Sequence, residues 1–94
     1  MAIRRFRHAG LEAFFRTGQT SGIQPEHTAR LRRILGRLDG ASSPFDMGLP
    51  GWRLHPLKGA RSGSWSVRVS ANWRLTFGFD GVHATDVNYE DYHS

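Results

Sequence analysis

Apolar and polar side chains alternate from residue 64 to residue 79, and this period of two constrains the fold more than any other feature. The apolar members of the alternation are Trp65, Val67, Val69, Leu75, Phe77 and Phe79. Such a pattern is typical of strands with one covered face and one open face. Turn residues at Ala71–Asn72 and Asp80–Gly81 predict tight connections between consecutive strands. A final strand is predicted over Val82–Asn88, with a bulge between Ala84 and Val87, where the parity breaks.

The first half of the chain shows a helical period instead. Its apolar stripes consist of Leu11, Phe14 and Phe15 in one segment and Leu31, Ile34, Leu35 and Leu38 in the next. They predict helices over Gly10–Thr17 and from Pro25, a favoured first-turn residue, to Leu38. A short strand is expected at Ala2–Phe6. The predicted fold is α+β, a single domain over residues 1–94: an N-terminal strand, two helices, then a mostly antiparallel meander of about four strands with the helices on one sheet face.

The charge of the chain favours a polyanionic partner. Thirteen basic residues face eight acidic ones, a formal net charge of +5. Arginine suits phosphate because its planar fork matches phosphate oxygens, and neutralised phosphates release counterions. A high-GC genome, which encodes arginine in preference to lysine, would explain the predominance of arginine equally well. It leaves open why the single lysine, Lys58, lies close to His55.

Several classes of protein are excluded or disfavoured by composition. The 94 residues contain no cysteine, so neither a disulfide framework nor a thiolate metal site is available. No apolar run approaches the length of a membrane span, and the basic N-terminus is not followed by the apolar stretch of a signal peptide. We therefore expect a soluble cytoplasmic domain without membrane contact.

Strand parity predicts which side chains share the open face. If Trp52 and Leu54 point towards the helices, then Arg53 and His55 point away from them, together with the arginines of the following strands, Arg68 and Arg74. This face should be uncovered and basic, and Arg53 and Arg68 are candidates to bind RNA. The other interpretation is that any one-sided antiparallel sheet has a polar outer face.

Acid–base side chains gather at the end of the chain, where Asp91, Tyr92 and His93 are consecutive. Together with the upstream residues His55, Lys58 and Arg74 they suit metal-free cleavage of RNA, which carries its own nucleophile in the 2′-hydroxyl. The histidines can exchange protons near neutral pH, and the two cations can stabilise an anionic phosphorane. The aspartate can act as a base or orient an imidazole, and the tyrosine can stack on a base or bind phosphate.

Each of these residues alone has a simpler explanation. A lone histidine is more often a satisfied surface residue, and Arg74 alone could form a salt bridge on the sheet. Tyr89 is expected to cap the core and Glu90 to be solvated. Asp91 and His93 lack the regular spacing of a metal site, so no metal and no other cofactor are expected.

Four ordered blocks closely resemble the HigB-type toxins of the RelE/ParE superfamily. They are Leu54-His-Pro-Leu-Lys-Gly59, Gly63-Ser-Trp-Ser-Val-Arg-Val69, Asn72-Trp-Arg-Leu-Thr-Phe77 and Asp86-Val-Asn-Tyr-Glu-Asp-Tyr-His93. The N-terminal half is similar as well, from Ile3-Arg-Arg-Phe6 through Leu11-Glu-Ala-Phe-Phe15 to the arginine-rich helix, so the resemblance spans nearly the whole chain.

The resemblance implies a RelE-like fold and a ribosome-dependent endoribonuclease that cuts mRNA and so inhibits translation. Its catalytic group carries over onto His55, Lys58, Arg74, Asp91, Tyr92 and His93, and Asn72 matches a position expected to help hold RNA. It also implies a cognate helix-turn-helix antitoxin of the HigA type, through which alone operator DNA is bound. Two other functions stay open: a gyrase-poisoning toxin of the ParE type and a non-catalytic module that binds RNA or the ribosome.

Overall fold

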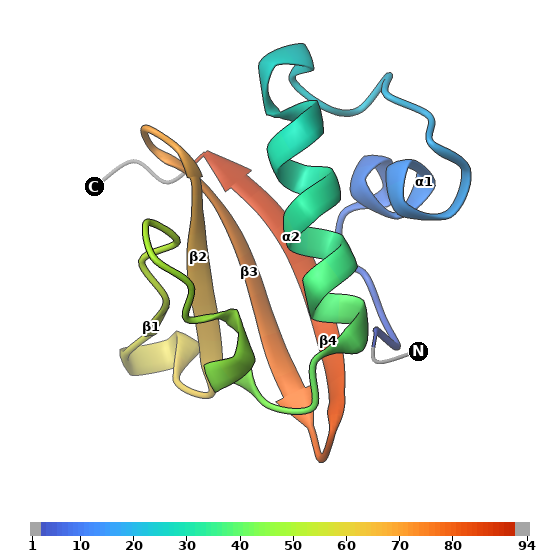
Figure 1. Cartoon of the computed structure of the whole chain (residues 1–94). Helices are drawn as coiled ribbons and strands as arrows, with labels where there is room; N and C mark the ends of the chain where they lie inside the picture. The colour runs from blue at the N-terminus through green and yellow to red at the C-terminus, as the bar shows by residue number, and fades with distance from the viewer. Residues whose placement is uncertain (1–2, 92–94) are drawn as a thin grey trace.

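The structure is a computed structural model that describes residues 3–91 (Figure 1). Two α-helices pack on one face of a four-stranded antiparallel sheet with strand order β1-β2-β3-β4, which confirms the predicted α+β class. The elements are α1 (Ala9–Thr17), η1 (Pro25–His27), α2 (Thr28–Gly40), η2 (Pro44–Met47), β1 (His55–Pro56), η3 (Gly59–Arg61), β2 (Ser64–Ser70), β3 (Trp73–Asp80) and β4 (His83–Asp91), where η marks short 3₁₀ helices.

The first helix follows its predicted bounds because both of its ends are capped. The His8 ring accepts a hydrogen bond from the Leu11 amide at 2.9 Å, which satisfies one free N–H of the first turn. At the other end, Gly18 adopts φ +83°, and its amide donates to the Phe14 carbonyl. Leu11 and Phe14 are buried, as the apolar stripe predicts.

The second helix differs from the prediction at both ends. Pro25 opens the 3₁₀ turn η1 rather than the α-helix, and α2 itself begins at Thr28 and runs to Gly40, two residues beyond the predicted end. The apolar stripe is confirmed, since its four members are buried in the core: Leu31, Ile34, Leu35 and Leu38.

The expected N-terminal strand is wrong for the residues that the structure describes. Between residues 3 and 6 there are only two isolated bridges, Ile3 with Ala84 and Phe6 with Val87, both parallel to β4; Ala2 lies outside the described range. A regular ladder cannot form there because β4 carries a bulge between its two bridged residues.

That bulge is the one that the parity break predicts. Residues 76–78 of β3 oppose residues 85–88 of β4, so β4 holds one extra residue. Asp86 adopts φ +52° at this point, a left-handed conformation that few residue types other than glycine accept readily.

The meander is confirmed, with two adjustments. The β2–β3 turn is at Ala71–Asn72 as predicted, whereas the β3–β4 loop is Gly81–Val82, one residue later than expected, because Asp80 pairs with His83. The strand expected after residue 52 is reduced to His55–Pro56 at the sheet edge. A proline is tolerated there because the N–H that it lacks would face solvent and not a neighbouring strand.

The face towards the helices carries the core. Val67, Leu75 and Phe77 are almost completely buried there, in agreement with the parity argument, and the predicted core position of Tyr89 is also confirmed. Trp65 is only partly buried and packs edge-on against Phe45.

Candidate functional site

The sheet face away from α2 carries two rows of side chains, which are set by the strand register. One row consists of His55, Ser66, Thr76 and Asn88, and the next consists of Arg68, Arg74 and Glu90. Neighbours in a row are cross-strand partners, and successive rows lie about 7 Å apart along the strands. The structure therefore brings His55, Arg68 and Arg74 to one face, as predicted.

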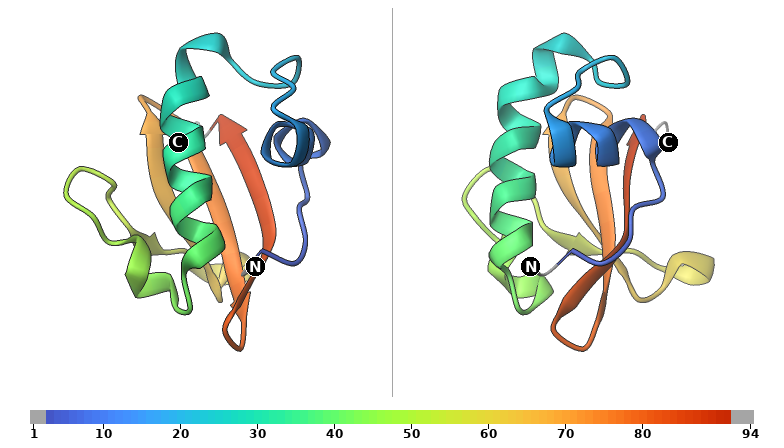
Figure 2. Two further views of the ribbon diagram at one scale, coloured as in Figure 1. Left: turned by 45° about the vertical axis from the view of Figure 1, so that its right-hand side comes forward. Right: turned by 90° about the vertical axis from the view of Figure 1, so that its right-hand side faces the viewer.

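The expectation that this face is uncovered is wrong. We nevertheless call it the open face, because neither α1 nor α2 packs on it (Figure 1). Residues 57–62 fold over it on the side opposite α2, as Figure 2 shows in its right-hand view. Ser66 and Thr76 are consequently only 1% and 2% exposed, and Leu57 is buried outside the main core. Parity predicts the direction of a side chain, but it does not predict a loop that returns over it.

His55 lies exposed at the start of β1, and its tautomer follows from its contacts. Its Nδ1 is 3.0 Å from the Arg53 carbonyl oxygen. A carbonyl can only accept, so Nδ1 carries the proton and Nε2 carries the lone pair. The hydroxyl of Ser66 is 3.4 Å from Nε2, a long contact. His55 is thus oriented with a basic nitrogen over the open face.

Arg68 and Arg74 lie directly opposite each other on β2 and β3. The Arg74 Nη1 donates to the carbonyls of Ala71 at 2.7 Å and Trp73 at 3.0 Å, which ties its guanidinium to the β2–β3 turn. Like charges at opposing positions destabilise a sheet. An anion bound between them relieves this repulsion, so the pair favours phosphate.

Lys58 is exposed and immediately precedes η3, the short helix that contains Arg61. The Arg61 guanidinium donates to both oxygens of Glu90, at 3.1 and 2.5 Å, and the Thr76 hydroxyl donates to the same carboxylate at 2.7 Å. This contact holds the segment after Lys58 against the sheet. Sequence reasoning missed it, and the expectation that Glu90 is solvated is wrong.

The pKa of Glu90 reflects this environment. Burial alone would raise the pKa, but the hydrogen bonds from Arg61 and Thr76, with the positive charges of Arg61 and Arg7, more than offset burial and lower the pKa below its usual value. The carboxylate is therefore kept ionised next to the arginine row.

The end of the chain is described only in part. Asp91 is exposed and pairs with Trp73 in the β3–β4 ladder, so it shares the sheet face of Trp73 and Tyr89, while its neighbour Glu90 shares the face of Arg74. The structure therefore brings Asp91 to the strand next to Arg74 but not to the same sheet face. Tyr92 and His93, the other two predicted catalytic residues of this segment, lie outside the described residues.

Of the three residues predicted to bind RNA, only Arg68 belongs to the arginine row. Arg53 is exposed with φ +51°, Asn72 is exposed in the β2–β3 turn, and Arg68 is half-buried. The Arg68 carbonyl accepts two hydrogen bonds from Arg30 of α2, at 2.9 and 3.3 Å. These bonds make Arg30 a structural tether between α2 and β2. Burial, followed by the charges of Arg33 and Arg68, lowers the pKa of Arg30.

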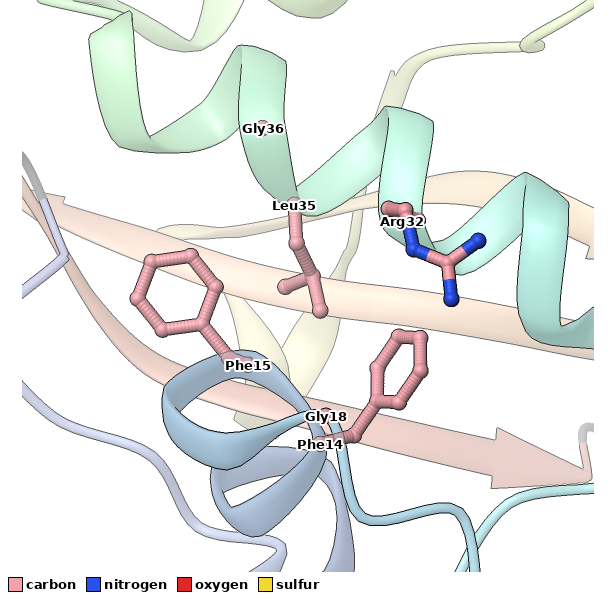
Figure 3. A pocket seen from close by; sticks show the side chains of 6 residues that line it. All are labelled: Phe14, Phe15, Gly18, Arg32, Leu35 and Gly36. Carbon is pink, nitrogen blue, oxygen red and sulfur yellow. The ribbon is translucent and has the colours of Figure 1, made fainter.

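A pocket of about 310 Å³ lies between the helices, on the other side of the sheet (Figure 3). Phe14 and Phe15 of α1 face Leu35 of α2 across it, and Arg32 lies over the Phe14 ring. Its lining is mostly apolar and lacks acid–base groups, so the open face is the better candidate for chemistry.

Neither a metal site nor a membrane span is found in the part of the chain that the structure describes. No three His, Asp or Glu side chains within residues 3–91 lie close enough to hold a metal ion. None of the helices in that range combines the length and apolar composition needed to cross a bilayer.

Comparison with known proteins agrees with this geometry. Endoribonuclease HigB of Proteus vulgaris is 43% identical to the chain over 91 residues, which cover 97% of this chain and 99% of that protein. The family model for the RelE-like toxin HigB of type II toxin–antitoxin systems matches residues 4–93. An antitoxin partner follows from the nature of such systems. The chain therefore belongs to the HigB family of RelE-like toxins of type II toxin–antitoxin systems.

Proposed function

We propose that this toxin is an endoribonuclease that cleaves mRNA on the ribosome and thereby stops translation. The relative from Proteus vulgaris carries the name of an endoribonuclease and shares 43% of its residues with this chain. The observation that carries the proposal is the arrangement of Arg68 opposite Arg74, on the sheet face that also presents the basic Nε2 of His55. This set offers anion binding and proton transfer on one surface.

The proposed reaction is an attack of the RNA 2′-hydroxyl on the adjacent phosphorus. The P–O5′ bond breaks, which leaves a 2′,3′-cyclic phosphate and a 5′-hydroxyl. One of His55, Asp91 and His93 removes the 2′ proton and another group protonates the leaving oxygen, each worth about 10²–10⁴-fold in rate. Lys58 and Arg74 stabilise the phosphorane, and Tyr92 binds the phosphate or stacks on a base.

The binding residues and partners complete the proposal. Arg53, Arg68 and Asn72 contact RNA around the cleavage site, and the whole chain of residues 1–94 acts as one domain. The antitoxin is of the HigA type, a helix-turn-helix protein that binds operator DNA, and the toxin reaches that DNA only through it. Since the substrate is mRNA on the ribosome, the site of action is the cytoplasm.

A translation assay with a primer-extension readout tests the proposal against its two rivals. Site-specific breaks in ribosome-bound mRNA support the ribonuclease. Inhibition of DNA gyrase without mRNA breaks would support a toxin of the ParE type, which lacks this set of side chains. Binding to ribosomes without cleavage would support a non-catalytic module, although such a module has no need for imidazoles and carboxylates beside its cations.

A 2′-deoxy substitution at the scissile nucleotide tests the chemistry. We expect it to abolish cutting, because it deletes the nucleophile and leaves the protein contacts to phosphate in place. The all-ribose mRNA of the same sequence is the matched control, analysed for its product ends by mass spectrometry. Efficient cleavage of the deoxy substrate would mean that water attacks, and the proton-transfer functions given to His55, Asp91 and His93 would be wrong.

A further inference from the structure

A buried polar contact lies on the covered face of the sheet, directly behind the candidate site. The imidazole of His27 is 3% exposed. Its Nδ1 is 2.5 Å from the Tyr89 hydroxyl and its Nε2 is 2.5 Å from the Ser70 hydroxyl. One side chain at the start of α2 thus joins the ends of β2 and β4.

Both ring nitrogens of His27 have a hydroxyl partner. A hydroxyl can donate or accept, so Tyr89 and Ser70 satisfy the imidazole in either tautomer. The backbone amide of Gln24 also donates to the Tyr89 oxygen at 3.4 Å. Burial raises the pKa of Tyr89, and Glu26 raises it further against the lowering effect of the Gln24 amide, so the phenol keeps its proton.

Aromatic packing reinforces the same point. Trp73 stacks on Tyr89 with ring centroids 4.6 Å apart and meets the edge of His27 at 5.5 Å. His8 packs edge-on against Tyr89 at 5.4 Å. The start of β3 is therefore fixed against His27 together with the ends of β2 and β4.

Every strand fixed in this way leads directly to a proposed site residue. Ser70 precedes the turn whose Ala71 carbonyl accepts from Arg74, and the Trp73 carbonyl accepts from the same guanidinium. Tyr89 precedes Asp91 by two residues in β4. A shift at His27 would therefore reach the arginine on β3 and the carboxylate on β4 through one or two backbone units.

We propose that His27 is a positioning residue for RNA cleavage. Its two hydrogen bonds hold the β2–β3 turn and the end of β4, so that Arg74 and Asp91 keep the spacing that the transition state requires. This inference rests on the proposed ribonuclease function. It assigns a purpose to a buried histidine that does not reach the open face.

His27→Leu, which fills the space but makes neither hydrogen bond, provides the main test. At saturating mRNA-programmed ribosomes we expect kcat to fall by about 10- to 100-fold with KM little changed, because displacement of reacting groups slows the chemical step. His27→Gln, which can still donate to Ser70, should lose less. Tyr89→Phe, which removes the Nδ1 partner together with the acceptor of the Gln24 amide, should lower kcat in the same manner. It provides the test if His27→Leu does not fold.

Ile34→Val is the matched control, since it loosens the core packing of the adjoining helix α2 and makes no change to the hydrogen-bonded side chains. It should lower the thermal midpoint and leave kcat unchanged. Folded His27→Leu or Tyr89→Phe with wild-type kcat would overturn the proposal, as would an equal loss in Ile34→Val at matched stability. If the wild-type toxin cuts no mRNA, the proposed function is wrong, but the positioning by His27 can still be tested.

NMR spectroscopy provides that test. If His27 positions the turn, the chemical shifts of the Arg74 Nε–H and the Asn72 amide should change in the His27 variants and not in Ile34→Val.

Discussion

The two faces of the sheet attach neighbouring segments to β4 through different kinds of contact. On the covered face, His27 joins β2 and β4 through hydrogen bonds to two hydroxyls inside an aromatic cluster. On the open face, Arg61 and Glu90 join a loop to β4 through a charged pair whose side chains are 40% and 22% exposed. A buried charge costs several kcal/mol to desolvate, whereas an exposed pair keeps much of its hydration.

The two faces therefore have different functions: one holds the strand ends in place, and the other presents the cations. The covered face holds the strand ends in place with buried side chains, which are shielded from a bound anion. The open face keeps its cations in contact with water, where a phosphate can reach them. The comparison predicts that loss of a site cation on the open face affects mainly activity, whereas changes to the apolar core on the covered face affect mainly stability. His27 is expected to differ from the rest of the covered face, because it positions residues of the candidate site.

Arg74→Ala should give the largest effect and would break the comparison if it destabilised the fold. We expect loss of about 2.7–4 kcal/mol of transition-state stabilisation, roughly 10²–10³-fold in the cleavage rate, because a preorganised charge at the phosphate is lost. Far-UV circular dichroism and the urea midpoint should stay close to wild type. Arg74→Lys, which keeps the charge but loses the fork, should recover part of the rate.

A paired exchange of valine and threonine sharpens the comparison at matched volume. Val67→Thr places a hydroxyl in the apolar core and should cost about 1–3 kcal/mol of unfolding free energy. Thr76→Val, under residues 57–62 on the other face, removes the hydrogen bond to the ionised Glu90 carboxylate and should cost about 1.5–3 kcal/mol. Urea unfolding of both variants tests whether a hydroxyl destabilises one face and stabilises the other; an increase in stability in either variant would contradict the comparison.

Acid pH should reveal the smallest effect. The folded pKa of Glu90 lies below its usual value, so its contribution to stability is fully present above about pH 4.3 and is lost as pH falls through the lowered folded value. For a partly exposed pair we expect about 0.2–1 kcal/mol. Glu90→Gln should flatten that part of the stability–pH curve, measured by urea unfolding; an unchanged slope would show that Arg61 contributes nothing through this pair.

The features predictable from the sequence are those that depend on the periodic spacing of apolar residues along a short segment. The alternation around Val67 and Phe77 predicted β2 and β3, and the parity break at residues 84–87 predicted the bulge in β4. The Arg61–Glu90 and His27–Tyr89 contacts were not predicted, because their partners are 29 and 62 residues apart and no period records such a distance. The candidate site was thus predicted as a set of residues, and its covering loop and buried support were not.

The pairing of residues 3–7 with β4 determines when the fold can be completed during translation. The amides of Arg4 and Arg7 donate to the carbonyls of Ala84 and Val87, so the first described segment protects the edge of the last strand. Because a chain is made from its N-terminus, the early segment must wait for nearly the whole sequence to be translated before it finds its partner. A toxin proposed to cut mRNA on the ribosome therefore cannot complete its sheet, or pair residues 3–7 with β4, while β4 is still being synthesised.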